Sequence, residues 1–279
     1  MQVVFKRVHK AFKQKGQTVQ ALRDINFEVA EGEFVCVIGP SGCGKSTLVS
    51  LVAGLEFPDS GQVFVDSKIV EGPSPDRLVV FQEAALFPWL TVLENVAFGL
   101  KIKGVSESER IQKSLEAIKM VHLSRFVNAH PHELSGGMKQ RAVIARALVM
   151  DPKILLMDEP FAALDAQTRN MLQEELQAIW QKTRKTIIFV THNVREATFL
   201  SDRVFEITAR PGTIKNEYPI HIPRPRREQD PSLLIVQTKI MSSLKDEIEK
   251  VAKEELDVDY EVSKEGLWTP VDKSAGSHI

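Results

Sequence analysis

The chain has 279 residues and a mass of 31.3 kDa, enough to bury one large hydrophobic core and carry a small appendage. Its 36 basic and 37 acidic side chains leave a formal net charge of -1, which argues against a large basic surface for nucleic acid. No stretch approaches the roughly 20 apolar residues that span a bilayer, and the N-terminus lacks the apolar core of a signal peptide. At a membrane, the chain would therefore need recruitment by a partner.

Strands and helices alternate along most of the chain. Runs of strand type lie at Val3–Val8, Ile25–Val29, Phe34–Ile38, Gly61–Val65, Leu78–Phe81, Ile154–Met157, Thr186–Val190 and Val204–Ile207. Helical patterns lie at Lys45–Ala53, Glu107–Val121, from Gly136 onward and at Gln167–Lys182. The alternation predicts an α/β fold with a mainly parallel sheet covered on both faces.

Two regions depart from this alternation. Residues 91–150 are all-helical and predict a subdomain inserted between strands. After residue 222 the composition becomes Pro- and Arg-rich, which predicts a linker. One helical face follows it, made of Leu233, Val236, Ile240, Leu244, Ile248 and Val251, and residues 272–279 are predicted to be disordered. The expected division is a main domain over 1–222 and a linker, helix and tail over 223–279.

A glycine-rich loop follows the apolar strand Phe34–Ile38. It fits the pattern G-x-x-x-x-G-K-[ST] and consists of Gly39, Pro40, Ser41, Gly42, Cys43, Gly44, Lys45, Ser46 and Thr47. Glycines let successive backbone N–H groups point at phosphates, and the following helix presents its positive end to the same anion. Lys45 can reach the terminal phosphates of ATP, and the Ser46 hydroxyl can bind Mg²⁺. Because a strand precedes the loop and a helix follows it, the sequence favours a phosphate-binding loop over a flexible glycine-rich turn.

Two carboxylates end the apolar strand at Ile154–Met157. Asp158 is the expected second protein ligand of Mg²⁺, and Glu159 would face the terminal phosphate, where it could deprotonate the attacking water. An Asp-Glu pair alone is more often a helix cap or loop start, but the phosphate loop reverses that preference. The cysteines, Cys36 and Cys43, lack metal-ligand spacing and are expected to be buried, reduced thiols of a cytosolic protein.

A second glycine-rich segment, Leu134–Arg141, precedes a helix. Ser135 suits a helix N-cap, and Gly136 and Gly137 suit a tight turn, so the segment alone is either an ordinary cap or a second anion site.

The full set of motifs resembles that of the ATP-binding-cassette (ABC) transporter ATPases over about residues 1–222. In family order these are the phosphate loop Gly39–Thr47, the Q-loop with Gln82, the signature segment Leu134–Gln140, the acidic strand Ile154–Glu159, the D-loop Ala163–Asp165 and the switch His192. Phe12 matches the aromatic residue that stacks on adenine, where many members have Tyr. The resemblance implies a P-loop NTPase (RecA-like) fold with an N-terminal antiparallel β-subdomain and an inserted helical signature subdomain.

The same resemblance implies a shared active site. In this family two cassettes pack head to tail, so Ser135 and Gly137 are expected to complete the ATP site of a second, identical cassette. Gln82 would sense Mg²⁺ and the attacking water, and His192 would contact the terminal phosphate. Catalysis is thus expected from Lys45, Gln82, Glu159 and His192, with Ser46, Gln82 and Asp158 around Mg²⁺.

The branch is indicated by Pro88-Trp89, by Phe161–Arg169 and by Ala209–Gly212, which look like the nitrate, sulfonate and taurine importers. The expected protein is therefore an ATPase on the cytoplasmic face of the cell membrane, peripheral to a permease and indirectly served by a solute-binding protein. The 57 residues after Ile222 are too few for the regulatory β-domain of sugar and polyamine importers.

Alternatives remain at this point. The branch also contains importers of thiamine-pyrimidine precursors. A cassette ATPase acting on DNA or the ribosome is disfavoured because only 89 residues separate Lys45 from Ser135, and because the chain holds one cassette. A binding module without turnover is disfavoured because Glu159 and His192 are both in place.

Overall fold

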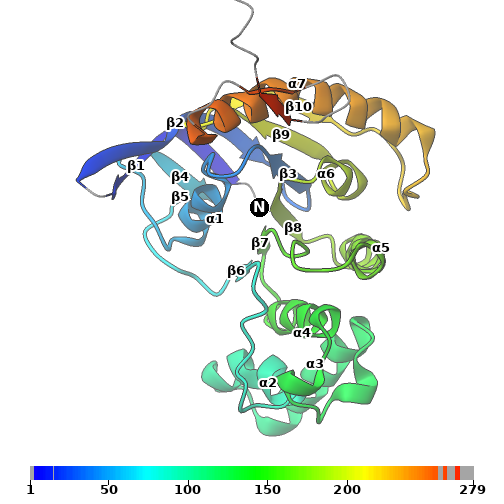
Figure 1. The fold of residues 1–279 in the computed structure, drawn as a ribbon. Helices are drawn as coiled ribbons and strands as arrows, with labels where there is room; N and C mark the ends of the chain where they lie inside the picture. Colours follow the sequence, from blue (N-terminus) through cyan, green and yellow to red (C-terminus); the bar gives the residue numbers. More distant parts are fainter. Residues whose placement is uncertain (1–2, 15, 257–259, 263–267, 271–279) are drawn as a thin grey trace, which may run out of the picture.

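A six-stranded sheet forms the centre of the molecule. The computed structural model describes residues 3–14, 16–256, 260–262 and 268–270 (Figure 1). The sheet has the order β10-β9-β3-β8-β7-β6, and its strands are β3 (Phe34–Ile38), β6 (Arg77–Val80), β7 (Ile154–Asp158), β8 (Thr186–Thr191), β9 (Arg203–Ile207) and β10 (Ile214–Pro219). Every neighbouring pair is parallel except β9 and β10. The predicted mainly parallel sheet is confirmed.

The position of β3 inside the sheet, covered on both faces, explains why its sequence is apolar at every position. Phe34, Cys36 and Ile38 join the hydrophobic cluster on one face of the sheet. Val35 and Val37 join the cluster on the other face. A strand covered on both faces needs an apolar residue at each position, because successive side chains point to opposite sides.

A second sheet makes the N-terminal β-subdomain. It has the order β2-β1-β4-β5 with antiparallel pairing throughout, from β1 (Val3–Gln14), β2 (Gln17–Val29), β4 (Ser60–Val65) and β5 (Lys68–Ile69). Both predicted strands at its start are longer than expected. The extra residues form a largely exposed hairpin arm, in which cross-strand pairing continues without an apolar pattern to reveal it.

Helices cover both faces of the central sheet and form the inserted subdomain. Helix α1 (Lys45–Ala53) packs between the two sheets, and α5 (Ala166–Thr183) and α6 (Val194–Leu200) lie across the other face (Figure 1). The insert contains α2 (Val92–Ile102), α3 (Glu107–Met120) and α4 (Gly136–Leu148), with the 3-10 turns Ser124–Phe126 and Pro131–Glu133. Helix α2 begins at a capping box between Thr91 and Glu94. In the described residues, no helix is long and apolar enough to cross a membrane.

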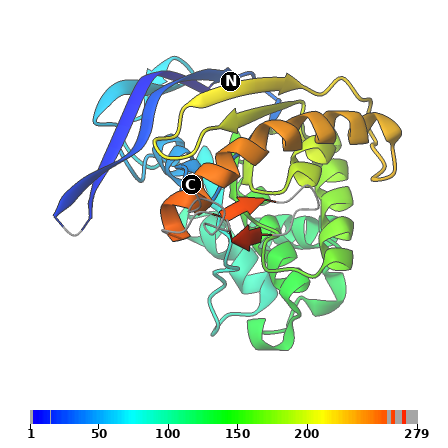
Figure 2. The same ribbon diagram turned by 45° about the horizontal axis from the view of Figure 1, so that its top comes forward.

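The C-terminal helix α7 (Pro231–Leu256) lies along the body beside β9 and β10 (Figures 1 and 2), and β11 (Tyr260–Val262) and β12 (Trp268–Pro270) form a short hairpin after it. Leu233, Ile240 and Leu244 are buried, as the predicted apolar face requires. Ile248 was expected on that face but is 46% exposed, because Glu247 occupies the inward position at this turn. Residues 272–279, predicted to be disordered, lie outside the described residues.

The Pro- and Arg-rich segment before α7 is fixed to the body by Arg226. This side chain is only 3% exposed. Its guanidinium donates to the carbonyl oxygens of five residues, Thr198, Phe199, Ser201, Ile220 and Ile222, at 2.6–3.2 Å. Burial lowers its pKa to about 10, so the group stays charged at neutral pH. The predicted linker is therefore a segment that Arg226 attaches to the main domain.

We expect Arg226→Ala to lower the free energy of unfolding by about 3 kcal/mol, because buried carbonyl oxygens lose a charged donor. Chemical denaturation measures this difference. Arg227→Ala removes the neighbouring exposed arginine and should change the free energy by about 0.5 kcal/mol or less. Equal effects of the two substitutions would contradict the anchoring role of Arg226.

Candidate functional site

Four loops meet at the carboxyl edge of the parallel sheet. The phosphate loop follows β3, Gln82 follows β6, Glu159 follows β7, and His192 follows β8. Since β3, β8 and β7 are adjacent, their loops are neighbours in space although they are far apart in sequence. Ligands of open α/β sheets bind at this edge.

The phosphate loop has the backbone conformation that its glycines predict. Gly44 caps α1 with a φ of 102°, a left-handed conformation in which a side chain would be strained. A Cβ atom on Gly44 would also lie 2.6 Å from the Leu22 side chain. Glycine is therefore needed where the loop joins the N-terminus of α1, the end of a helix that attracts anions.

Lys45 lies at the centre of the loop and is 5% exposed. Its ammonium group donates to the carbonyl oxygens of Gly39 and Pro40, both at 2.9 Å. The Glu159 carboxylate lies 3.8 Å away. A fixed, largely desolvated cation in an open loop is suited to bind a phosphate chain.

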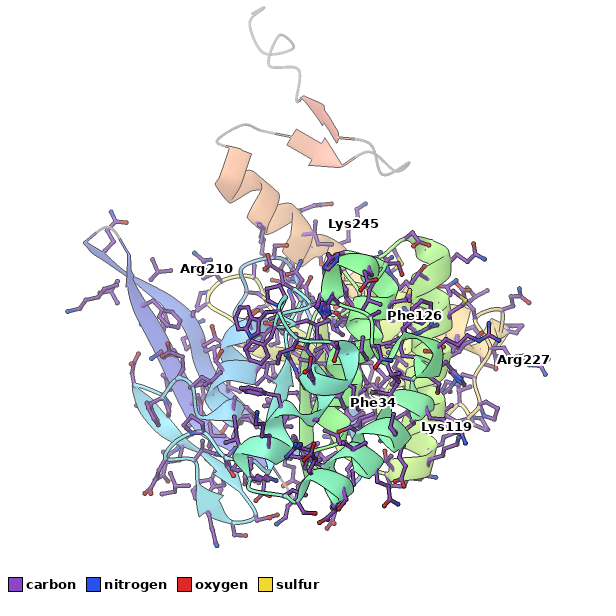
Figure 3. All side chains as sticks on the ribbon, turned by 90° about the horizontal axis from the view of Figure 1, so that it is seen from below. Phe34, Lys119, Phe126, Arg210, Arg227 and Lys245 are labelled. Atoms are coloured by element: carbon purple, nitrogen blue, oxygen red, sulfur yellow. The ribbon has the colours of Figure 1, made fainter. Side chains whose placement is uncertain are left out.

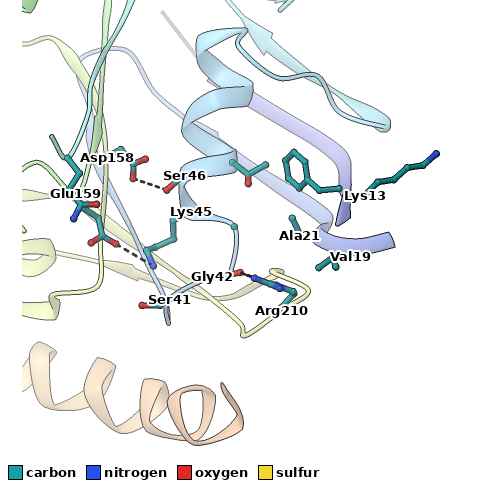
Figure 4. Close-up of a pocket in the computed structure, with 14 residues that line it drawn as sticks. Lys13, Val19, Ala21, Ser41, Gly42, Lys45, Ser46, Asp158, Glu159 and Arg210 are labelled. Carbon is teal, nitrogen blue, oxygen red and sulfur yellow. Dashed lines mark hydrogen bonds and ion pairs between the residues drawn. The ribbon is translucent and has the colours of Figure 1, made fainter. Parts of the chain in front are cut away.

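Ser46 and Asp158 bring two oxygen atoms together below the loop. The Ser46 hydroxyl donates to Asp158 Oδ1 at 3.1 Å (Figure 4). Burial raises the pKa of Asp158, while the Ser46 hydrogen bond and the charge of Lys45 oppose the rise. A bound cation would favour the charged carboxylate, and both side chains offer the oxygen ligands that Mg²⁺ prefers.

Glu159 and His192 form a pair beside this position. His192 Nδ1 donates to Glu159 Oε2 at 2.9 Å. The Glu159 backbone has a φ of 46°, unusual for a residue with a side chain, and its N–H donates to the Val190 carbonyl at 3.0 Å. Such strained positions cluster at functional sites, where the surroundings hold the residue in place.

One cavity of about 670 Å³ joins the phosphate loop and the two carboxylates to the β-subdomain (Figure 4), and His192 is not among the described residues that line it. Its lining includes Lys45, Gln82, Asp158 and Glu159, and also Phe12 on β1. Phe12 is 37% exposed, and Lys10 Nζ lies over its ring at 5.0 Å from the ring centre, as cations often lie over aromatic rings. The predicted phosphate, carboxylate and aromatic groups therefore surround a single space.

Ser135 and Gly137 lie in the inserted subdomain and are not among the described residues that line this cavity. Ser135 caps α4, and its hydroxyl accepts from the Met138 N–H at 3.3 Å. A Cβ atom on Gly137 would lie 2.4 Å from the Thr168 side chain at the start of α5. Close packing thus explains Gly137 within the chain, and a site made by one chain alone does not use this segment.

Arg169 shapes the D-loop between β7 and α5. Its guanidinium donates to the carbonyl oxygens of Phe161 and Leu164 at 3.3 and 2.8 Å. The buried Glu196 carboxylate lies 3.6 Å from Arg169 and accepts from the Thr191 hydroxyl at 2.7 Å. The D-loop is thereby tied to the end of β8, next to His192.

Arg210 also lines the cavity, although no sequence motif predicts a binding role for it. In the sequence, Ala209–Gly212 indicates only the resemblance to the nitrate, sulfonate and taurine importers. Nothing in its sequence context reveals the contact, because the loop between β9 and β10 reaches the phosphate loop only in the folded chain.

The fold and the site define a nucleotide-binding ATPase of the P-loop class, and comparison with known proteins agrees. A family model described as "ABC transporter" matches residues 22–162. The uncharacterized ABC transporter ATP-binding protein MJ0412 of Methanocaldococcus jannaschii is 55% identical over 88% of this chain and 91% of its own length. The chain belongs to the ABC transporter family, as one of its ATP-binding, ATP-hydrolysing subunits.

Named relatives and solved structures add detail. The nitrate import ATP-binding protein NrtD of Synechocystis is 50% identical over 77% of this chain and 81% of its own. The aliphatic sulfonates import protein SsuB of Bacillus cereus is 44% identical over 86% and 95%. A dimeric ABC transporter cassette, MJ0796, superposes with a TM-score of 0.71 at 35% identity, over 79% of this chain and 100% of its own. Its post-hydrolysis state with ADP and phosphate gives a TM-score of 0.69 at 34% identity over the same shares.

Proposed function

We propose that this chain energises the uptake of a small anionic solute, of the nitrate or sulfonate type, through a partner permease. The observation that carries the proposal is the 50% and 44% identity to nitrate and sulfonate import subunits. The subunit would lie on the cytoplasmic face of the membrane, and a solute-binding protein would deliver the solute to the permease on the other side. The near-zero net charge supports a role that involves no nucleic acid.

The working unit in this proposal is a pair of cassettes, supported by the dimeric form of the related cassette MJ0796. Lys45, Asp158 and Glu159 of one chain would face Ser135 and Gly137 of the other. The positive N-terminus of α4 would then meet the terminal phosphate across the interface. Without it, part of the phosphate charge would face solvent.

Each side chain of the site has a proposed task. Phe12 stacks on adenine, and Lys45 with the backbone of residues 39–47 binds the phosphates. Glu159 takes a proton from the attacking water, and His192 orients Glu159 and contacts the terminal phosphate. Gln82 contacts the water and the metal.

Magnesium is the proposed metal, held by Ser46 and Asp158 with Gln82 nearby. When bound it would neutralise phosphate charge. No group of three or more His, Cys, Asp or Glu side chains in the described part of the chain could hold a metal. Mg²⁺ would therefore take its other ligands from the nucleotide and water, as it usually does.

A groove between the sheet and the inserted subdomain is the proposed seat of the permease. It has a volume of about 430 Å³ and includes Phe87 and Phe98 in its lining. Trp89 stands at 5.6 Å from Phe87, ring centre to ring centre, and is 71% exposed. The buried Asn95 amide fixes this loop through hydrogen bonds to Phe87 and to the carbonyl oxygens of Leu90 and Thr91. An exposed aromatic on a rigid loop suits a helix-in-groove contact.

The proposed function is tested by isolating the intact complex through a tag on this chain. We expect membrane subunits to accompany it, and solute to stimulate ATP hydrolysis when the complex is placed in vesicles with its solute-binding protein. Nitrate and an alkanesulfonate should each be tried. Isolation without any membrane protein would overturn the transport role, and stimulation by an uncharged solute alone would overturn the solute class.

We expect Trp89→Ala to weaken association with the permease about 10-fold or more, because an aromatic anchor is often worth 2 kcal/mol or more. Co-purification yield and titration of detergent-solubilised permease measure this loss. Ile102→Ala is the matched control, since Ile102 is 72% exposed at the C-terminal end of α2, whereas Trp89 precedes α2 and contacts the groove residue Phe87. Equal association of both variants with the permease would show that the permease does not bind at this groove.

A further inference from the structure

The loop between β9 and β10 connects the nucleotide cavity to helix α7. On one side, Arg210 donates from Nε and Nη2 to the Gly42 carbonyl of the phosphate loop, at 3.2 and 3.1 Å (Figure 4). On the other side, the Ala209 N–H donates to the Glu247 carboxylate of α7 at 2.9 Å. Adjacent residues of one short loop thus hold two distant parts of the chain.

Arg210 has the chemistry of a phosphate ligand. It lines the cavity beside Ser41 and Gly42, yet its side chain is exposed. Arginine carries five N–H donors, and two of them are used on Gly42, so three are left for a ligand. A guanidinium group on the rim of a cavity built for a polyanion is attracted to its phosphates and can bind two oxygens at once.

The loop has little room to place Arg210 elsewhere. A Cβ atom on Gly212 would lie 2.2 Å from the Cys43 carbonyl oxygen, so the loop backbone rests directly on the phosphate loop. The Gly212 N–H donates to Ala21, and the Gly212 carbonyl accepts from Arg23, both at 2.9 Å. The β-subdomain therefore fixes one end of the loop.

Glu247 fixes the other end. It is 2% exposed and lies 3.2 Å from the Lys215 ammonium and 2.9 Å from that of Lys250. A buried carboxylate is tolerated only with such partners, and its second oxygen is bound to the Ala209 N–H. Ser243, one turn earlier, donates to the buried Glu206 of β9 at 2.8 Å and strengthens the same contact.

We propose that Arg210 binds the phosphate chain of the nucleotide, and that Glu247 is a positioning residue that holds the Arg210 loop against the phosphate loop. Helix α7 thereby sets the nucleotide affinity of the cassette. Both residues lie outside the segment 22–162 that the family model matches. The inference concerns the isolated subunit and depends on neither the solute nor the permease of the proposed function.

The first test is Arg210→Ala. We expect the Kd for a fluorescent ATP analogue with Mg²⁺, and the KM for ATP, to rise about 10-fold, with kcat within about twofold of the parent. Arg210→Lys should give an intermediate Kd. Arg227→Ala is the control, an exposed arginine at the opposite side of the molecule (Figure 3), and should leave Kd unchanged. A Kd for Arg210→Ala within twofold of the parent would overturn the proposal.

The second test separates positioning from stability. Glu247→Ala removes the acceptor of the Ala209 N–H and should raise KM as much as Arg210→Ala does. Glu247→Gln keeps an acceptor and should stay within twofold of the parent. The double variant Arg210→Ala/Glu247→Ala should show no further rise, and the neighbouring exposed Asp246→Ala should show none. A Glu247→Ala variant with a lower Tm but parental ATP affinity, or additive effects in the double variant, would overturn the positioning role.

Discussion

Glu159→Gln is expected to lower the rate of ATP hydrolysis about 1,000-fold, since a positioned general base contributes about 10²- to 10⁴-fold. Glutamine keeps the size of the side chain and can still accept a hydrogen bond from His192, but it cannot take up a proton. The hydrogen bonds from Lys45 to the Gly39 and Pro40 carbonyl oxygens do not involve Glu159, so ATP binding should persist. With binding intact and turnover blocked, the closed pair of cassettes should accumulate in ATP and Mg²⁺.

Phosphate release measures the rate, and light scattering in ATP and Mg²⁺ measures the dimer. Glu174→Gln, an exposed carboxylate on α5, provides the matched control and should hydrolyse ATP at the parental rate. Turnover in Glu159→Gln within tenfold of the parent would show that another group is the base. The pair of Glu159 with His192 would then have a structural purpose only.

Lys45→Ala is expected to weaken ATP binding by between about 10- and 100-fold, the range that a lost hydrogen bond to a charged group gives. The ammonium group is nearly fully buried and is held by the carbonyl oxygens of Gly39 and Pro40, so its position needs no reorganisation when the phosphates enter. Arg210 lies on the rim of the cavity, bonded to Gly42, and does not occupy the position of the Lys45 ammonium group. Equilibrium titration with ATP measures the effect.

Lys113→Ala is the control for this substitution, because Lys113 is exposed on α3 and pairs with Glu109 of the same helix. Circular dichroism should show both variants folded. If Lys45→Ala bound ATP as tightly as Lys113→Ala, the phosphate loop would not be the nucleotide site, and the common cavity would need another ligand.

Much of the fold could be predicted because local patterns and tertiary structure agree in the nucleotide-binding core. The strand Phe34–Ile38 and the helix Lys45–Ala53 have the predicted bounds. The apolar run defines the strand, and the glycine-rich loop after it separates the strand from the helix. The hairpin arm of β1 and β2 was underestimated, because its exposed residues carry no apolar alternation. β10 was missed for a related reason: it is an edge strand with one buried side chain, Tyr218.

The residues of the candidate site also fall into two groups, those that sequence motifs indicate and those that only tertiary contacts reveal. Motif order alone indicated Lys45, Asp158 and Glu159, because each follows a strand whose carboxyl end must face the same edge of a parallel sheet. Arg210 and Glu247 have no motif. They matter through contacts over 168 and 38 residues of sequence, which no local spacing predicts.

The family and the nucleotide-binding motifs could be recognised from the order of amino acids, because they depend on short segments whose backbone geometry is local. The attachment of the C-terminal part depends instead on contacts between distant segments of the folded chain. The apolar pattern placed Ile248 inward, whereas the buried position belongs to Glu247. A carboxylate can lie there because Lys215, Lys250 and the Ala209 N–H compensate its charge, and two of those partners come from other elements of the fold.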